Sequence, residues 1–293
     1  MRAADLIRLV VLAAIWGGSF IFMRILAPVL GPIITAELRV LIAGLALLGY
    51  FRVIRFDMQF RRYWKQYLLI GAINSAIPFF MYSFAALHIP ASYSVILNSS
   101  SPLWSAILAA FWLGERLTLL RGLGLVVGAS GVFLVANVPP ADVDSWFLLS
   151  VIACLIATLC YGFTAVWIKK HGTMLKPMAI AGASQLMAAF VLIPAIPAFP
   201  TRGEITPFIA LNVLGLAIIC SSIAYLLYYR LIADVGPTKA LTVTFLMPLF
   251  GVVWGMLFLH EEITAAMLAG MALILLGTGL VLNMVRLPLR KSH

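Results

Sequence analysis

Apolar stretches, each close to 20 residues long, alternate with short polar connections along the whole chain. Each stretch is continuous, a pattern that favours membrane-spanning helices over the alternating strands of a barrel. The pattern predicts ten transmembrane helices, at residues 6–27, 32–51, 67–86, 91–113, 121–138, 146–168, 177–198, 207–230, 238–259 and 265–285. The longest connection, residues 52–66, is too short for a soluble domain.

The second half of the chain repeats the first. Around the expected fourth and fifth helices the repeat has a spacing of 146 residues and no gap, and its members are Pro102, Glu115, Thr118, Gly124 and Gly131, then Pro248, Glu261, Thr264, Gly270 and Gly277. A weaker echo, 145 positions apart, relates residues 16–19 to residues 161–164. We therefore expect two five-helix halves, residues 1–141 and 142–293.

An odd number of helices in each half has a geometric consequence. The first helices of the two halves enter the membrane from opposite sides, so the halves are related by a pseudo-two-fold axis in the membrane plane. The expected fold class is an all-α integral membrane protein whose ten transmembrane helices form two inverted five-helix repeats. This plan is typical of secondary transporters, in which the pathway runs between the halves.

Composition supports a membrane protein, because 63% of the residues are hydrophobic and only 10% are charged, against about 25% charged in soluble domains. The mean hydropathy is +1.09. The three cysteines, Cys154, Cys160 and Cys220, all fall inside expected spans and show neither a disulfide framework nor a metal-ligand spacing. We expect no metal and no other cofactor.

Lysine and arginine predict the orientation of the chain. If the N-terminus is cytoplasmic, 17 of the 20 basic residues fall on the cytoplasmic side, and only Arg202 falls on the opposite side. Both termini are therefore expected in the cytoplasm. The net charge of +10 then reflects topology and gives no support to nucleic-acid binding.

Several of these motifs resemble a known family. The five-plus-five arrangement, the Trp-Gly-Gly-Ser-Phe at 16–20, the spacing from Pro32 to Arg39, and the two Pro…Leu-x-Glu-x-(Leu/Ile)-Thr…Gly…Gly stretches are similar to the EamA-type branch of the drug/metabolite transporter superfamily. The resemblance covers nearly the whole chain. Within the branch, the chain resembles bacterial aromatic amino acid exporters of the YddG type. The resemblance implies export of amino acids across the bacterial inner membrane, through a central cavity that opens to each face in turn.

Polar groups and prolines inside the spans are candidates for substrate contact and gating. Asn98 and Ser99 precede Pro102 in the fourth helix, and hydroxyl residues precede Pro248 in the ninth. A proline leaves a helix carbonyl without its partner, which a membrane tolerates only near protein or water. We expect helix breaks or gates at Pro78, Pro102 and Pro248, and substrate contacts from Asn98 and Ser99. Alternatively, the hydroxyls are small packing residues bonded to their own helix.

Aromatic residues divide into an interfacial belt and cavity candidates. Those near span ends fit a belt: Tyr63, Trp64, Tyr67, Trp112, Trp146 and Trp167. Four fall well inside spans and are expected to line the cavity: Trp16, Tyr82, Trp104 and Tyr225. Asn74 and Ser222, on the helices of Tyr82 and Tyr225, complete the expected substrate-binding set. Core packing, with backbone partners for the polar tips, is the alternative.

Charges inside the membrane are few. Arg39 lies about 10 Å into the second helix, too deep for a loop charge. We expect Arg24 and Glu37 to form a structural pair, with contact to a substrate carboxylate as the alternative for either arginine. Glu115 and Glu261 hold matching places at span ends, where each is expected to cap a neighbouring helix or to act in a gate. No acidic residue lies at mid-span, so gradient-driven export without proton coupling is the simpler expectation.

Two classes of function follow from these features. A transporter of aromatic and other neutral amino acids fits the aromatic, hydroxyl-rich spans, and a multidrug or other metabolite exporter, with or without proton coupling, is the alternative in the same class. An intramembrane enzyme would need a nucleophile–base or metal constellation at mid-span, and the sequence shows none. We expect a monomer in the lipid bilayer that binds a small-molecule substrate and no nucleic acid.

Overall fold

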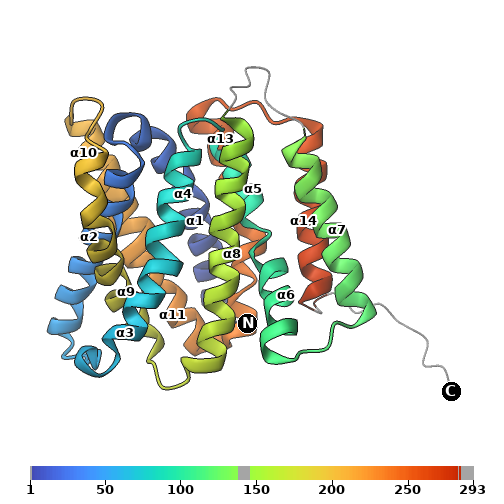
Figure 1. Ribbon diagram of the computed structural model, residues 1–293, viewed down its shortest axis with the longest axis horizontal. Helices are drawn as coiled ribbons and strands as arrows, with labels where there is room; N and C mark the ends of the chain where they lie inside the picture. The colour runs from blue at the N-terminus through green and yellow to red at the C-terminus, as the bar shows by residue number, and fades with distance from the viewer. Residues whose placement is uncertain (1, 138–145, 283, 285–293) are drawn as a thin grey trace.

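The computed structural model describes residues 2–137, 146–282 and 284, and within these it is built of helices (Figure 1). The described helices form ten spans. Five belong to the first half: α1 (Ala3–Leu30), α2 (Pro32–Val53), the run α3 (Phe60–Gly71), η1 (Ala72–Ala76) and α4 (Ile77–Ala85), the pair α5 (Ala91–Asn98) and α6 (Ser101–Leu113), and α7 (Leu119–Ala136). Five belong to the second: α8 (Phe147–His171), α9 (Pro177–Leu192) with η2 (Ile193–Ala198), the run α10 (Pro207–Leu214), η3 (Gly215–Ile223) and α11 (Ala224–Val235), the pair α12 (Pro237–Ala240) and α13 (Val243–Leu259), and α14 (Ala265–Val281).

The ten predicted spans are confirmed, with ends that differ by a few residues. Eight are long and apolar enough to cross a membrane, and α13 and α14 are shorter, at 17 residues each. The repeated threonines explain where two helices begin, because Thr118 accepts a hydrogen bond from the Arg121 amide and Thr264 accepts one from the Met267 amide. Side-chain oxygens at this position satisfy free amides of the first turn.

Three of the spans depart from a regular α-helix, each near its middle. The third span contains the π-helical segment η1 immediately before Pro78, and the eighth contains η3 at the matching place in the repeat. The fourth span breaks at residues 99–100, directly before Pro102 in the first turn of α6. The breaks expected at Pro78 and Pro102 therefore coincide with irregular backbone.

The break expected at Pro248 is wrong, because α13 runs through this proline. The ninth span is interrupted earlier, at residues 241–242. At this position the hydroxyls of Thr242 and Thr244 donate to the carbonyls of Lys239 and Leu241, at 2.7 and 2.8 Å. The same two carbonyls also accept from the backbone amides of Thr242 and Thr244, so the interruption leaves neither of them free.

The two halves pack about a pseudo-two-fold axis, which is visible in the pairing of α7 with α14 at one edge of the bundle (Figure 1). A Cβ added at Gly124 would lie 2.7 Å from the Gly277 carbonyl oxygen, and one at Gly131 would lie 2.7 Å from that of Gly270. Gly124 and Gly270 are repeat mates, as are Gly131 and Gly277. Gly124 therefore faces the repeat mate of Gly131, and Gly131 faces the repeat mate of Gly124. Only an antiparallel, symmetric crossing of α7 and α14 produces this arrangement.

Apolar side chains cover the perimeter of the spans. Phe111 is 85% exposed and Phe133 is 68% exposed, as expected where lipid replaces water as the surrounding medium. Below, the face at which α1 begins is called the basic face, because it carries the connections rich in lysine and arginine, and the other is called the opposite face.

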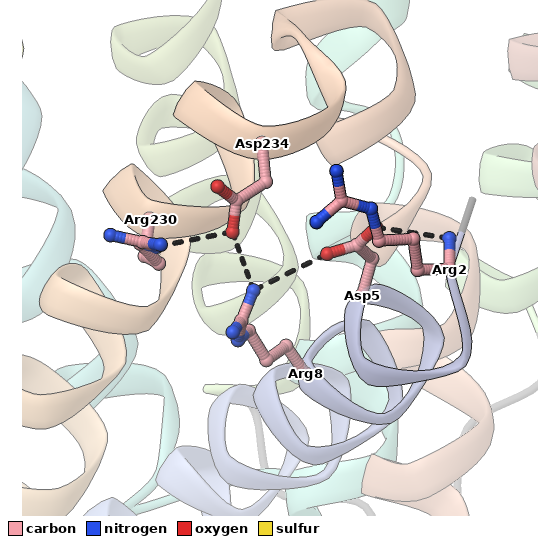
Figure 2. Close-up of polar contacts among 5 residues, drawn as sticks. All are labelled: Arg2, Asp5, Arg8, Arg230 and Asp234. Atoms are coloured by element: carbon pink, nitrogen blue, oxygen red, sulfur yellow. Dashed lines mark hydrogen bonds and ion pairs between the residues drawn. The ribbon is translucent and has the colours of Figure 1, made fainter.

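At the basic face, charged side chains join α1 to α11 (Figure 2). Arg8 donates to the carboxylates of Asp5, at 3.3 Å, and Asp234, at 2.5 Å, and Arg230 donates to Asp234 at 3.1 Å. The cluster holds the first and eighth spans together at this face.

Candidate functional site

Two aromatic pairs lie at the centre of the bundle and are related by the repeat. Trp16 of α1 packs on Tyr228 of α11, with ring centroids 5.2 Å apart. Their repeat mates are Tyr161 of α8 and Tyr82 of α4, whose rings stack at 6.4 Å. Tyr225 contacts Trp16 edge-on at 6.2 Å. Below, these two pairs are called the aromatic walls. The expectation that Trp16, Tyr82 and Tyr225 line a substrate cavity stays a prediction, because the two cavities described below are lined by other residues.

Tyr82 also connects to the broken fourth span. Its hydroxyl donates to the Asn98 side-chain oxygen at 2.7 Å, and its ring meets Phe20 edge-on at 5.1 Å. Asn98 is half-buried, whereas Tyr82 is buried. The two residues favoured from the sequence for the fourth and third spans are thus in direct contact.

Two polar groups on α2 and α9 form a second symmetric motif. Arg39 donates from Nε to the Ser221 hydroxyl at 3.1 Å, and its guanidinium lies 3.7 Å over the ring of Phe79. Gln185 donates from Nε2 to the Ser75 hydroxyl at 3.1 Å and to the Tyr225 hydroxyl at 3.4 Å. Three residue pairs separated by 146 positions build these two motifs: Arg39 with Gln185, Ser75 with Ser221, and Phe79 with Tyr225.

The remaining predicted ligands lie around this centre with other contacts. Ser222 donates to the Ala43 and Ala217 carbonyls, and Ser99 donates to Val95 of its own helix, as the packing alternative supposes. Trp104 is half-buried and packs against Gly162. Asn74 is half-buried within η1. Their roles in substrate binding stay predictions.

The expected pair between Arg24 and Glu37 is wrong, since no ion pair joins them in the described chain. Arg24 donates to the carbonyl of Ala86, at the end of the third span, and lies within the electrostatic influence of Glu261. A helix C-terminus carries partial negative charge, so it competes for the guanidinium. Glu37 is 4% exposed, and its Oε2 has no hydrogen-bond partner among the described residues.

Glu261 caps the fourth span, one of the two roles predicted for it. Its carboxylate accepts hydrogen bonds from the backbone amides of Ala91, at 2.6 Å, and Ser92, at 2.9 Å, and from the Ser92 hydroxyl, at 2.5 Å. These groups belong to the first turn of α5, where a helix carries partial positive charge. The carboxylate thus closes α5 onto the connection between α13 and α14 at the opposite face.

Glu115, the mate of Glu261, makes different bonds. It accepts from Lys169 at 2.5 Å and from Arg121 at 3.1 Å, and the hydrogen bond from Lys169 is the main reason that its pKa lies below the usual glutamate value. A cavity of about 200 Å³ leads from this ion cluster to Pro102 and Ser105, halfway along the fourth span. The two repeat mates therefore hold different partners at the two faces, and the cavity beside Glu115 is lined by residues of α6, α7, α8 and α14.

A larger cavity of about 480 Å³ lies between α1, the α10–η3 run and α13. Its walls are almost entirely apolar, and they include Phe208 and Phe258, which are 61% and 65% exposed. Asn212 is its polar exception, and its amide donates to the Phe208 carbonyl at 2.8 Å. The cavity opens toward the lipid-facing perimeter.

Three residues of the centre were missed from the sequence, although the repeat contained the signal. Tyr161 stands 145 positions after Trp16, Tyr228 stands 146 positions after Tyr82, and Gln185 stands 146 positions after Arg39. Projecting each candidate onto its mate would have found all three.

Comparison with known proteins agrees with this architecture. The chain is 24% identical to the uncharacterized transporter YvbV of Bacillus subtilis over 273 residues, which cover 92% of this chain and 88% of the relative. It is 24% identical to the protein PecM of Dickeya dadantii, over 89% of this chain and 86% of that protein. One solved crystal structure shares the fold, with a TM-score of 0.67 and 17% identity over 97% of this chain and 98% of its own.

The EamA-like transporter family matches twice, at residues 6–137 and 148–283. Together with the inverted helical architecture, these matches identify the chain as a multi-pass membrane transporter that belongs to the EamA-like transporter family.

Proposed function

We propose that this transporter exports neutral amino acids, with aromatic ones preferred, across the bacterial inner membrane. The observation that supports this most directly is the pair of symmetric aromatic walls, Trp16 with Tyr228 and Tyr82 with Tyr161. Aromatic rings at such spacings attract another ring by about 0.5–1.5 kcal/mol beyond area burial.

The proposed mechanism is alternating access by a monomer with its basic face and both termini in the cytoplasm. In the proposed cycle, this structure represents the state in which substrate enters from the basic face past Glu115 and Lys169, while Glu261 holds the opposite face closed. Exchange of the two conformations between the halves would release Glu261 and close the basic face. No cofactor takes part, and the substrate gradient drives net export.

A second candidate is export of amphipathic compounds, as in multidrug transporters. The apolar cavity of about 480 Å³ beside α1 favours it, because lipid-soluble molecules could enter there from the bilayer. The two candidates differ in their expected competitors.

Flux of radiolabelled phenylalanine in proteoliposomes tests the proposal. Tryptophan, tyrosine and leucine should compete well, and glutamate and lysine poorly. Trp16→Ala should weaken competition by aromatic amino acids roughly threefold to tenfold, whereas Trp64→Ala, at a side chain 45% exposed on α3, should leave it unchanged. Preference for glutamate or lysine, or competition only by lipophilic cations, would refute amino acid export.

A further inference from the structure

Arg39 is a buried cation without a counterion. Its side chain is 6% exposed, and no carboxylate of the described residues lies within ion-pair distance. Nε binds the neutral Ser221 hydroxyl, Nη1 lies 3.6 Å from the Met23 sulfur, and Nη2 has no hydrogen-bond partner in the described chain. An unpaired charge in a membrane interior is costly, and such residues commonly serve binding or transport.

Gln185 occupies the matching place in the other half. It lacks a hydrogen-bond donor, whereas Arg39 lacks an acceptor. Gln185 is 0% exposed, its Nε2 is satisfied by Ser75 and Tyr225, and its Oε1 is a buried acceptor without a donor among the described residues. Unsatisfied buried acceptors are rare, because each loses its hydration without compensation.

The pseudo-two-fold axis makes the comparison between the two positions informative. The serine and aromatic neighbours of Arg39 recur around Gln185, yet one position offers unused donors and a positive charge, and the other offers an unused acceptor. Arg39 bonds Ser221 and Gln185 bonds Tyr225, and these two partners lie four residues apart in the eighth span. Both unused groups therefore lie beside the same stretch of this span.

We propose that Arg39 and Gln185 form a subsite for the two charged ends of a zwitterion. Arg39 binds the carboxylate through its free guanidinium donors, and Gln185 Oε1 accepts a hydrogen bond from the ammonium group. The side chain of the ligand then points to the aromatic walls. This assignment rests on the proposed function and adds to it the requirement for both an α-carboxylate and an α-ammonium group.

A structural role is the competing explanation, because Arg39 joins α2 to η3 through Ser221 and to α4 through Phe79. Loss of a structural clamp would weaken all ligands alike. Loss of the subsite would weaken only those that carry the group which Arg39 or Gln185 binds.

The experiment compares L-phenylalanine, L-phenylalaninamide and 3-phenylpropionate as competitors of phenylalanine flux and as stabilisers in thermal unfolding of the purified protein. For the unaltered protein, both analogues should bind about tenfold to hundredfold more weakly than phenylalanine, the range for a hydrogen bond to a charged group. In Arg39→Gln, the affinity for phenylalanine should fall to that for phenylalaninamide, and the affinity for phenylalaninamide itself should not change. In Gln185→Leu, the affinity for phenylalanine should fall to that for 3-phenylpropionate.

Arg202→Gln, at an exposed arginine of the opposite face, is the matched control and should behave as the unaltered protein. Arg39→Lys keeps the charge and tests the inference if Arg39→Gln fails to fold, since it should retain partial discrimination for the carboxylate. Equal binding of acid and amide by the unaltered protein, or equal weakening of both in the variant, would overturn the subsite. If carboxylates stabilise the protein through Arg39 but no amino acid is transported, the proposed function fails and the carboxylate site stands.

Discussion

At the scale of single residues, a substitution of Glu37 distinguishes gradient-driven export from proton-coupled export. Glu37 is a buried acidic residue with an unpaired oxygen in α2, and buried carboxyls of this kind carry protons in coupled transporters. If export is gradient-driven, phenylalanine flux should not respond to a pH gradient. Glu37→Gln should then change neither the flux nor this lack of response. A flux that responds to the gradient in the unaltered protein and loses this response in the variant would establish proton coupling.

The ionisation of Glu115 does not affect the measurement on Glu37 between pH 6 and pH 8. The pKa of Glu115 lies below the usual glutamate value because Lys169 donates a hydrogen bond to it. A lowered pKa keeps the carboxylate ionised through this range, and its ion pairs are lost only when the pH falls below the usual value toward the lowered one. Glu115→Gln should therefore alter flux equally at both pH values.

The depth of a residue along its span can be predicted from the sequence more readily than the direction in which its side chain points. Trp16 contacts Tyr225 and Tyr82 contacts Asn98 inside the bundle, and a role of these four residues in substrate binding stays a prediction. Depth along a helix does not tell which neighbour a side chain faces, and the Arg24–Glu37 pair failed for that reason. The Ala86 carbonyl that Arg24 binds is a backbone acceptor, which no sequence pattern marks.

At the scale of helices, the two repeat prolines should differ in effect. Pro102 lies in the first turn of α6 beside a break, where the Asn98 carbonyl accepts from the Ser101 hydroxyl at 2.7 Å instead of from a backbone amide. Pro102→Ala restores an amide and should straighten the fourth span, lowering turnover in proteoliposomes with little loss of folded protein. Pro248→Ala, within the continuous α13, should change turnover less. The reverse order would contradict this account of the break.

The crossing of α7 and α14 sets a limit on side-chain size. A Cβ at Gly277 would lie 2.5 Å from the Gly124 carbonyl oxygen and closer still to the Gly128 amide nitrogen. Gly277→Ala should therefore destabilise the protein by about 1–3 kcal/mol, the cost of overpacking, as measured by thermal unfolding in detergent. Gly122→Ala is the control in α7, because no atom lies within 4 Å of its added Cβ, and it should be neutral or stabilising by up to about 1 kcal/mol.

The spans were predictable because the bilayer requires long apolar runs, but their irregularities were only partly so. A proline marks the break near Pro102, whereas η3 contains no proline and so gives no such signal. At the interruption at residues 241–242, the hydroxyls of Thr242 and Thr244 donate to nearby carbonyls. Threonines in many regular helices make similar bonds, so their presence alone does not locate a break.

At the scale of the whole molecule, the two halves share a plan and differ in state. Glu261 caps α5 at the opposite face, while its mate Glu115 is held by Lys169 and Arg121 at the basic face. In an inverted repeat, the second state of the transporter follows by exchanging the two conformations. The repeat at 146 residues predicts this symmetry, but the sequence alone does not reveal that the two glutamates bind different partners.

Distances between spin-label pairs test this exchange most directly. Labels at Leu87 and Glu262 span the opposite face, and labels at their mates, Ala233 and Arg116, span the basic face. Without substrate, the first pair should be close and the second far apart. With saturating phenylalanine, a second population should appear. In it, the distance between the labels at Leu87 and Glu262 lengthens, and the distance between the labels at Ala233 and Arg116 shortens toward the value that the first pair has without substrate. Distances that stay fixed, or that lengthen at both faces together, would contradict alternating access by exchange between the halves.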